Sequence, residues 1–133
     1  MKLTFKGGIH PYEGKELTMD KDVIEYVPKG DMVYPLSQHI GAPAKAVVKK
    51  GDRVLVGQLI AEAGGFVSAN IHSSVSGTVK AVEPRLTASG SKVNSIVIEN
   101  DNQFEEIEYV KNDKPLAELN REEILEAIKN AGV

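Results

Sequence analysis

Short apolar runs, separated by turns that contain glycine, fill the middle of the chain. The clearest runs are residues 46–48, 59–63, 76–82 and 93–98. The last run alternates, so Ile96 and Ile98 share one face of a strand while Val97 lies on the other. Runs this short, spaced this closely and ended by glycine, predict short β-strands in a small barrel or sandwich.

Two further strand candidates come earlier. Residues 23–27 and 32–36 are rich in valine, isoleucine and tyrosine, and residues 28–31 between them have turn composition. Pro35 places the second candidate at the edge or the end of a sheet. Residues 1–18 contain a glycine pair and a His-Pro step, which predict an irregular amino-terminal arm.

The spacing of apolar residues changes near the carboxyl end from that of a strand to that of a helix, so we expect a short helix there. Asn120 is a good N-cap, Glu123 completes a capping box, and Gly132 fits the position just beyond the last turn. The apolar stripe of this helix comprises Leu119, Ile124, Ala127, Ile128 and Ala131. A helix of this length is marginal by itself, so it needs a surface to pack on.

Composition narrows the classes of protein that remain. A chain of 133 residues is one domain with at most an appendage, and without tryptophan its core must be aliphatic. A net charge of -3 argues against general nucleic-acid binding. The absence of cysteine excludes disulfides, thiolate nucleophiles and cysteine-held iron–sulfur clusters within this segment. No visible signal peptide and no run of about 20 apolar residues argue against direct membrane insertion.

Residues 49–63 and 71–82 each read as strand, glycine turn and strand. Together they resemble the core of biotinyl and lipoyl domains, the barrel-sandwich hybrid fold. We therefore expect a mainly β barrel-sandwich hybrid with an irregular amino-terminal arm and a short carboxy-terminal α-helix. Carrier proteins of this fold present a lysine on the hairpin between the two blocks, whereas residues 64–70 here contain none. A carrier domain remains an alternative that this hairpin disfavours.

Three blocks carry a more specific resemblance. They are residues 7–11 (Gly-Gly-Ile-His-Pro), 35–44 (Pro-Leu-Ser-Gln-His-Ile-Gly-Ala-Pro-Ala) and 71–79 (Ile-His-Ser-Ser-Val-Ser-Gly-Thr-Val). Their order and spacing resemble the amino-terminal region of the RnfC family, the C subunits of Rnf electron transport complexes. The A subunit of the sodium-translocating NADH:quinone oxidoreductase is a more distant relative of similar design.

The resemblance implies a longer parent protein. Residues 1–110 would form the barrel-sandwich hybrid with its arm, and residues 111–133 a linker and helix leading to a nucleotide-binding domain outside this segment. The parent would bind FMN, NADH and two [4Fe–4S] clusters there, so no catalytic, cofactor or metal residue is assigned to this chain. Its partners would be the other Rnf subunits, at the cytoplasmic side of the bacterial inner membrane, in a complex that couples ferredoxin:NAD electron exchange to ion transport.

Five residues are candidates for contact with a partner. His10, His39 and His72 lie in the three blocks, and each either helps bind a partner, a metal or a flavin phosphate, or holds its own loop by hydrogen bonds. Phe66 and Val67 stand where a carrier has its lysine, on a hairpin that is either a docking finger or folded onto the barrel. The sequence therefore predicts a non-catalytic docking module, with a carrier or a histidine-based metal or small-ligand domain as alternatives.

Overall fold

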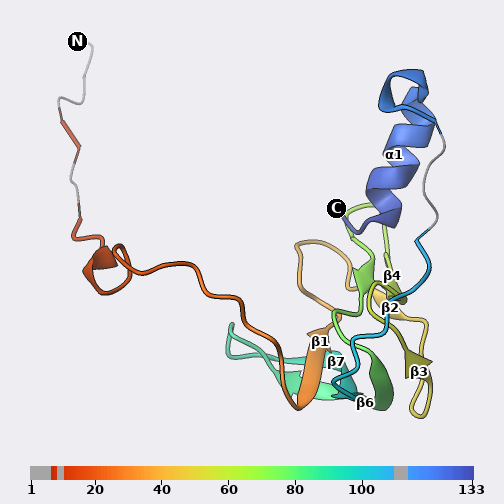
Figure 1. Ribbon diagram of the computed structural model, residues 1–133, viewed down its shortest axis with the longest axis horizontal. Coiled ribbons are helices and arrows are strands. Elements are labelled where there is room, and N and C mark those ends of the chain that lie inside the picture. Colours follow the sequence, from red (N-terminus) through yellow and green to blue (C-terminus); the bar gives the residue numbers. More distant parts are fainter. Residues whose placement is uncertain (1–6, 9–10, 110–113) are drawn as a thin grey trace.

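The computed structural model describes residues 7–8, 11–109 and 114–133. In this part of the chain, seven strands form two sheets, followed by one α-helix (Figure 1). The strands are β1 (Asp31–Pro35), β2 (Lys45–Ala46), β3 (Arg53–Val54), β4 (Leu59–Glu62), β5 (Ile71–His72), β6 (Gly77–Leu86) and β7 (Lys92–Asn100). The helical elements are two 3₁₀ turns, η1 (Lys15–Leu17) and η2 (Leu116–Glu118), and the helix α1 (Arg121–Asn130).

Both sheets are antiparallel. One has the strand order β1-β7-β6-β3 and the other the order β2-β4-β5. The long pair β6 and β7 forms a hairpin that carries the first sheet, while β1 and β3 each add a strand at one of its sides. This arrangement confirms the expected mainly β fold, and β6 and β7 extend beyond the runs that the sequence marked.

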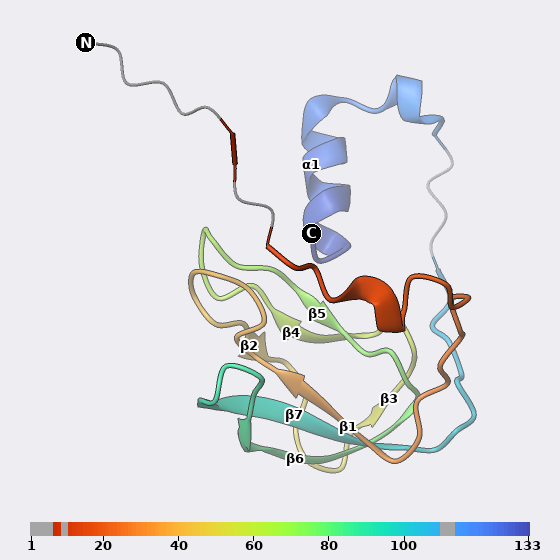
Figure 2. The same cartoon turned by 90° about the vertical axis from the view of Figure 1, so that its left-hand side faces the viewer.

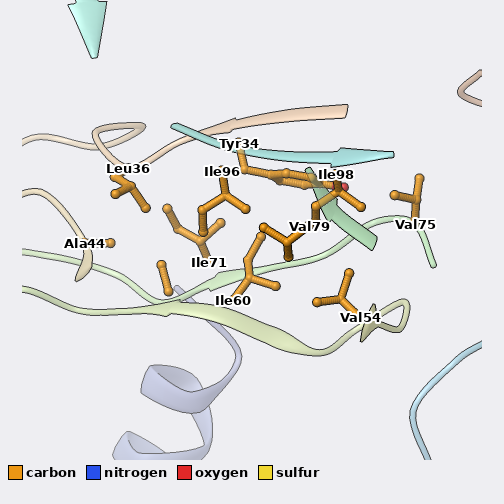
Figure 3. Close-up of a cluster of buried hydrophobic side chains, with 11 residues drawn as sticks. Tyr34, Leu36, Ala44, Val54, Ile60, Ile71, Val75, Val79, Ile96 and Ile98 are labelled. Carbon is orange, nitrogen blue, oxygen red and sulfur yellow. The ribbon is translucent and has the colours of Figure 1, made fainter. Parts of the chain in front are cut away.

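The core lies between the two sheets (Figure 3). Ile60 of β4 and Ile96 and Ile98 of β7 are fully buried there, and their side chains face one another across the sandwich. Val97 is also buried but lies outside this cluster, as the alternation along β7 predicts. Burying an aliphatic side chain of this size contributes about 1.5–3 kcal/mol, so this cluster is the main source of stability.

The segment after β7 is tied back to the barrel by a polar network. Ser76 donates to Asp101 Oδ1 at 2.6 Å and accepts from the backbone N–H of Glu105 at 3.0 Å. Arg53 Nη1 lies 3.0 Å from Asp101 Oδ2. The Ser76 hydroxyl, the backbone N–H of Gln103 and Arg53 together hold the pKa of Asp101 below its usual range. This network fixes the path of the chain where it leaves the sheet.

Two strand predictions need correction. Residues 23–27 form no strand: they are exposed, and no described segment pairs with their backbone in this structure. The predicted run 46–48 contributes only its first residue, to β2 (Lys45–Ala46). In Figure 1 the described part of the arm from residue 11 to residue 27 runs away from the barrel.

The predicted helix is present with its capping box. Asn120 Oδ1 accepts from the backbone N–H of Glu123 at 2.9 Å, and Glu123 Oε2 accepts from the backbone N–H of Asn120 at 2.8 Å. None of the ten residues of α1, all of them described, is buried, so its apolar stripe is not covered by the barrel. The helix touches the barrel through its last turn, where Asn70 Nδ2 donates to the carbonyl of Lys129 at 3.2 Å. No helix in the described residues is long and apolar enough to cross a membrane.

Candidate functional site

The hairpin at residues 63–70, between β4 and β5, is braced from both sides. Its own side chains close it: Ser68 Oγ accepts from the backbone N–H of Gly64, and Asn70 Oδ1 from that of Ala63, each at 2.9 Å. The loop at residues 36–43 lies against it, and the N–H of Ala42 donates to the carbonyl of Val67 at 2.9 Å. A Cβ at position 64 would collide with the carbonyl oxygen of Pro43, so only glycine allows this close packing.

This bracing leaves the tip of the hairpin fully open. Phe66 is 104% exposed and Val67 is 51% exposed. The position that a carrier domain would give to its lysine therefore presents an aromatic ring. Lys80, one of the lysines nearest in sequence, lies 2.8 Å from the Asp31 carboxylate, and this hydrogen bond raises its pKa. Lys80 is held as a charged partner in an ion pair, which is unlike a modified lysine on a free hairpin.

A cleft of about 410 Å³ lies beside the base of the hairpin. Its lining comes from β1, the loop after β1, the hairpin, β5 and the segment after α1: Tyr34, Gln38, His39, Ala69, Asn70, Ile71, His72, Ala131 and Gly132. Two of the three sequence-predicted histidines, His39 and His72, thus share one cleft. The third, His10, lies outside the described residues.

The two histidines of the cleft have different surroundings. His39 Nε2 accepts from the backbone N–H of Ala69 at 3.2 Å, and His39 Nδ1 lies 3.0 Å from the carbonyl oxygen of Ile40. These contacts correspond to a neutral ring with its proton on Nδ1, which joins the loop after β1 to the hairpin. His72 is partly buried on β5 and lines this cleft as well as a neighbouring one of about 540 Å³.

The hydroxyl of Tyr34, another residue that lines the cleft, is bound to the turn that follows β5. The Tyr34 hydroxyl lies 2.9 Å from Ser74 Oγ and accepts from the Ser74 backbone N–H at 3.1 Å. This bonding engages the Ser74 hydroxyl in holding the turn that follows β5. In the described part of the chain, no group of three histidine, aspartate or glutamate side chains is placed to hold a metal ion.

Sequence reasoning missed a second groove of about 440 Å³, between the hairpin tip and α1. Phe66 lines it from the hairpin, and Leu125, Ile128 and Val133 line it from the carboxy-terminal segment. The four side chains are between 44% and 104% exposed. The apolar stripe of α1 was visible in the sequence, but nothing there indicated that it would share a groove with residues 64–70.

The family described as the RnfC barrel sandwich hybrid domain matches residues 3–103. The C subunit of the Na(+)-translocating ferredoxin:NAD(+) oxidoreductase complex of Acetobacterium woodii is 45% identical over 98% of this chain and 29% of its own length. The C subunit of the proton-translocating ferredoxin:NAD(+) oxidoreductase complex of Clostridium ljungdahlii is 42% identical over 100% of this chain and 29% of its own.

A third relative, the C subunit of the ion-translocating oxidoreductase complex of Rhodobacter capsulatus, is 47% identical over 75% of this chain and 20% of its own length. The chain thus spans less than a third of the length of these relatives. The family match covers the arm, both sheets and the hairpin between β4 and β5. This chain belongs to the family of RnfC barrel sandwich hybrid domains.

Proposed function

We propose that this chain is a non-catalytic docking domain of the RnfC subunit of an ion-translocating ferredoxin:NAD oxidoreductase complex. In this proposal residues 1–110 are the barrel with its arm, and residues 111–133 are a linker and helix that lead to a nucleotide-binding domain. FMN, NADH and two [4Fe–4S] clusters bind to the parent protein outside this segment. The domain contacts other subunits of the complex, peripherally, at the cytoplasmic side of the bacterial inner membrane.

One observation carries the proposal: an aromatic side chain stands fully exposed on a braced hairpin. The Phe66 side chain is 104% exposed, whereas the backbone around it is held by three hydrogen bonds. Rigid aromatic residues are the residues that most often supply binding energy at protein interfaces, because they bury a large area and lose little conformational entropy. The fold thus keeps the hairpin of its carrier relatives and offers an apolar contact in place of a lysine.

The test is assembly of the complete complex with Phe66→Ser in the RnfC subunit. The substitution removes the ring at an exposed site and leaves the core unchanged, so the domain folds normally. We expect the other subunits to co-purify at a clearly reduced level. Leu86→Ser is the matched control, because Leu86 is also exposed (71%) but lies at the far end of β6. Assembly of the Phe66→Ser complex at the wild-type level would refute the docking role of the hairpin.

The two alternatives have direct tests of their own. Intact mass after expression with a biotin or lipoyl ligase measures carriage, and any added group on the chain would replace the docking proposal with a carrier function. Metal analysis of the purified chain tests the alternative that the histidines bind a metal. A stoichiometric metal lost on His72→Ala would give the cleft a ligand-binding function.

A further inference from the structure

The outer side of β1 is a free sheet edge. In the described part of the chain β1 pairs only with β7, in a register that sets Met32 opposite Ile98 and Tyr34 opposite Ile96. The N–H of Leu36 donates to the carbonyl of Asn94 at 2.9 Å. Because hydrogen bonds alternate along an antiparallel pair, the N–H and C=O of Val33 then point away from β7. They are available to a further strand.

A suitable segment lies next to this edge in the chain. Residues 23–27 (Val-Ile-Glu-Tyr-Val), here called the strap, have the composition of a strand but lie outside every strand of the structure. Their apolar side chains are between 51% and 102% exposed. No backbone hydrogen bond joins the strap to any other described residue. The strap leads through residues 28–30 directly into the start of β1 (Figures 1 and 2).

The segment between the strap and β1 has the sequence of a hairpin loop. Residues 28–30 are Pro, Lys and Gly, and Gly30 has a φ of 76°. A three-residue hairpin loop is a type I turn followed by a residue in the left-handed region, where proline favours the first position and glycine the last. The carbonyl of Pro28 also accepts from Asn100 Nδ2 at 3.0 Å, which anchors the turn on the sheet.

The side chains fit the same pairing. A loop at residues 28–30 sets Glu25 opposite Val33, Tyr26 opposite Met32 and Ile24 opposite Tyr34. Tyr34 is buried in the core and Met32 packs against it, so Ile24 and Tyr26 would extend the apolar face of the sheet. Glu25, the one charged residue of the strap, would lie on the outer face with the half-exposed Val33.

We propose that the free edge of β1 is a strand-binding site and that its occupant is residues 23–27 of the same chain. The closed strap places Ile24 beside Tyr34, which lines the 410 Å³ cleft together with His39 and His72. Closure therefore brings an apolar side chain next to a residue of this cleft. Attachment through a three-residue turn gives the strap a high effective concentration at its own β1, which favours this occupant over a second copy. Strap closure does not depend on the role of Phe66.

A disulfide trap tests the register. The chain has no cysteine of its own, so Glu25→Cys with Val33→Cys introduces a single pair at exposed positions. Directly opposite residues have Cα atoms about 5.5 Å apart, within the range of a disulfide. Lys21→Cys with Val33→Cys is the control, because closure in the proposed register separates these positions by about 13 Å along the strand.

We expect an intramolecular disulfide in the first pair, at a yield at least several-fold above the control. Hydrogen exchange on the unmodified chain gives a second readout: the amides of Glu25 and Val33 should exchange about tenfold more slowly than those of Ile24 and Tyr26. Equal yields in the two pairs, or no disulfide together with uniform fast exchange over the strap, would overturn the proposal. Disulfide-linked dimers would assign the edge to a second copy and overturn the same-chain occupant.

Discussion

Ile60 is the position at which we expect a substitution to lower the free energy of unfolding clearly. Its side chain is 0% exposed and lies in the middle of the sandwich, between β4 and the strands of the other sheet (Figure 3). Ile60→Ala removes Cγ1, Cγ2 and Cδ1. At about 0.8 kcal/mol for each buried carbon, the transfer loss is about 2.4 kcal/mol, and the remaining cavity brings the total to about 3 kcal/mol.

The same substitution at Ile128 is the matched control. Ile128 is 44% exposed on α1, which has no buried residue among its ten described positions. Only about half of the transfer loss applies there, and the better helix propensity of alanine offsets part of it. We expect Ile128→Ala to cost about 0.5 kcal/mol.

Urea unfolding followed by far-UV circular dichroism measures both variants. An unchanged slope with a lower midpoint identifies a loss of native stability. For a chain of this size, 3 kcal/mol corresponds to a fall in Tm of roughly 12 °C. A loss below about 1 kcal/mol in Ile60→Ala, or equal losses in the two variants, would refute the assignment of stability to the two-sheet core.

Two further predictions concern the hairpin and the helix. Gly64→Ala should lower the Tm of the domain and speed amide exchange in the hairpin, because the new Cβ collides with the Pro43 carbonyl. In the control Gly8→Ala the new Cβ meets open space, so neither quantity should change. Thermal unfolding and hydrogen exchange measure the two effects. Lys114 Nζ lies 2.6 Å from the Glu123 carboxylate and lowers the pKa of Glu123. The contribution of ionised Glu123 to helix stability is therefore complete above the ordinary glutamate pKa, and it is lost as the pH falls through the lower pKa of the folded state. The protection factors of the α1 amides, measured against the intrinsic exchange rate at each pH, should fall with acid in the wild type, and an equal fall in Glu123→Gln would contradict this.

Exposed apolar residues are concentrated in the parts of this chain that surround the barrel. The strap, the hairpin tip and α1 each carry large apolar side chains that are at least 44% exposed. Contiguous exposed apolar surface usually marks a contact region, because its exposure costs free energy in water. This distribution supports the proposal that the segments around the barrel, and not its core, make the contacts of the domain.

Local sequence patterns determined much of the fold. The alternation at Ile96, Val97 and Ile98 identified both faces of β7, because a strand turns successive side chains to opposite sides. The capping box at Asn120 and Glu123 located the start of α1, because its two hydrogen bonds join residues only three apart. The absence of lysine from residues 64–70 argued against a carrier hairpin without reference to any structure.

Only the tertiary structure determined which segments pair with or pack against one another. Residues 23–27 have the composition of a strand but remain unpaired in the structure, because strand formation depends on a neighbour that local sequence does not specify. His39 and His72 are far apart in the chain and share one cleft only because the loop after β1 lies against the base of the hairpin. The cleft beside the hairpin and the groove next to α1 both arise from contacts between segments that are distant in the chain. Strand propensity, alternation and helix capping act over only a few residues. The sequence alone therefore indicated the strands and the helix, whereas only the folded structure revealed the cleft and the groove.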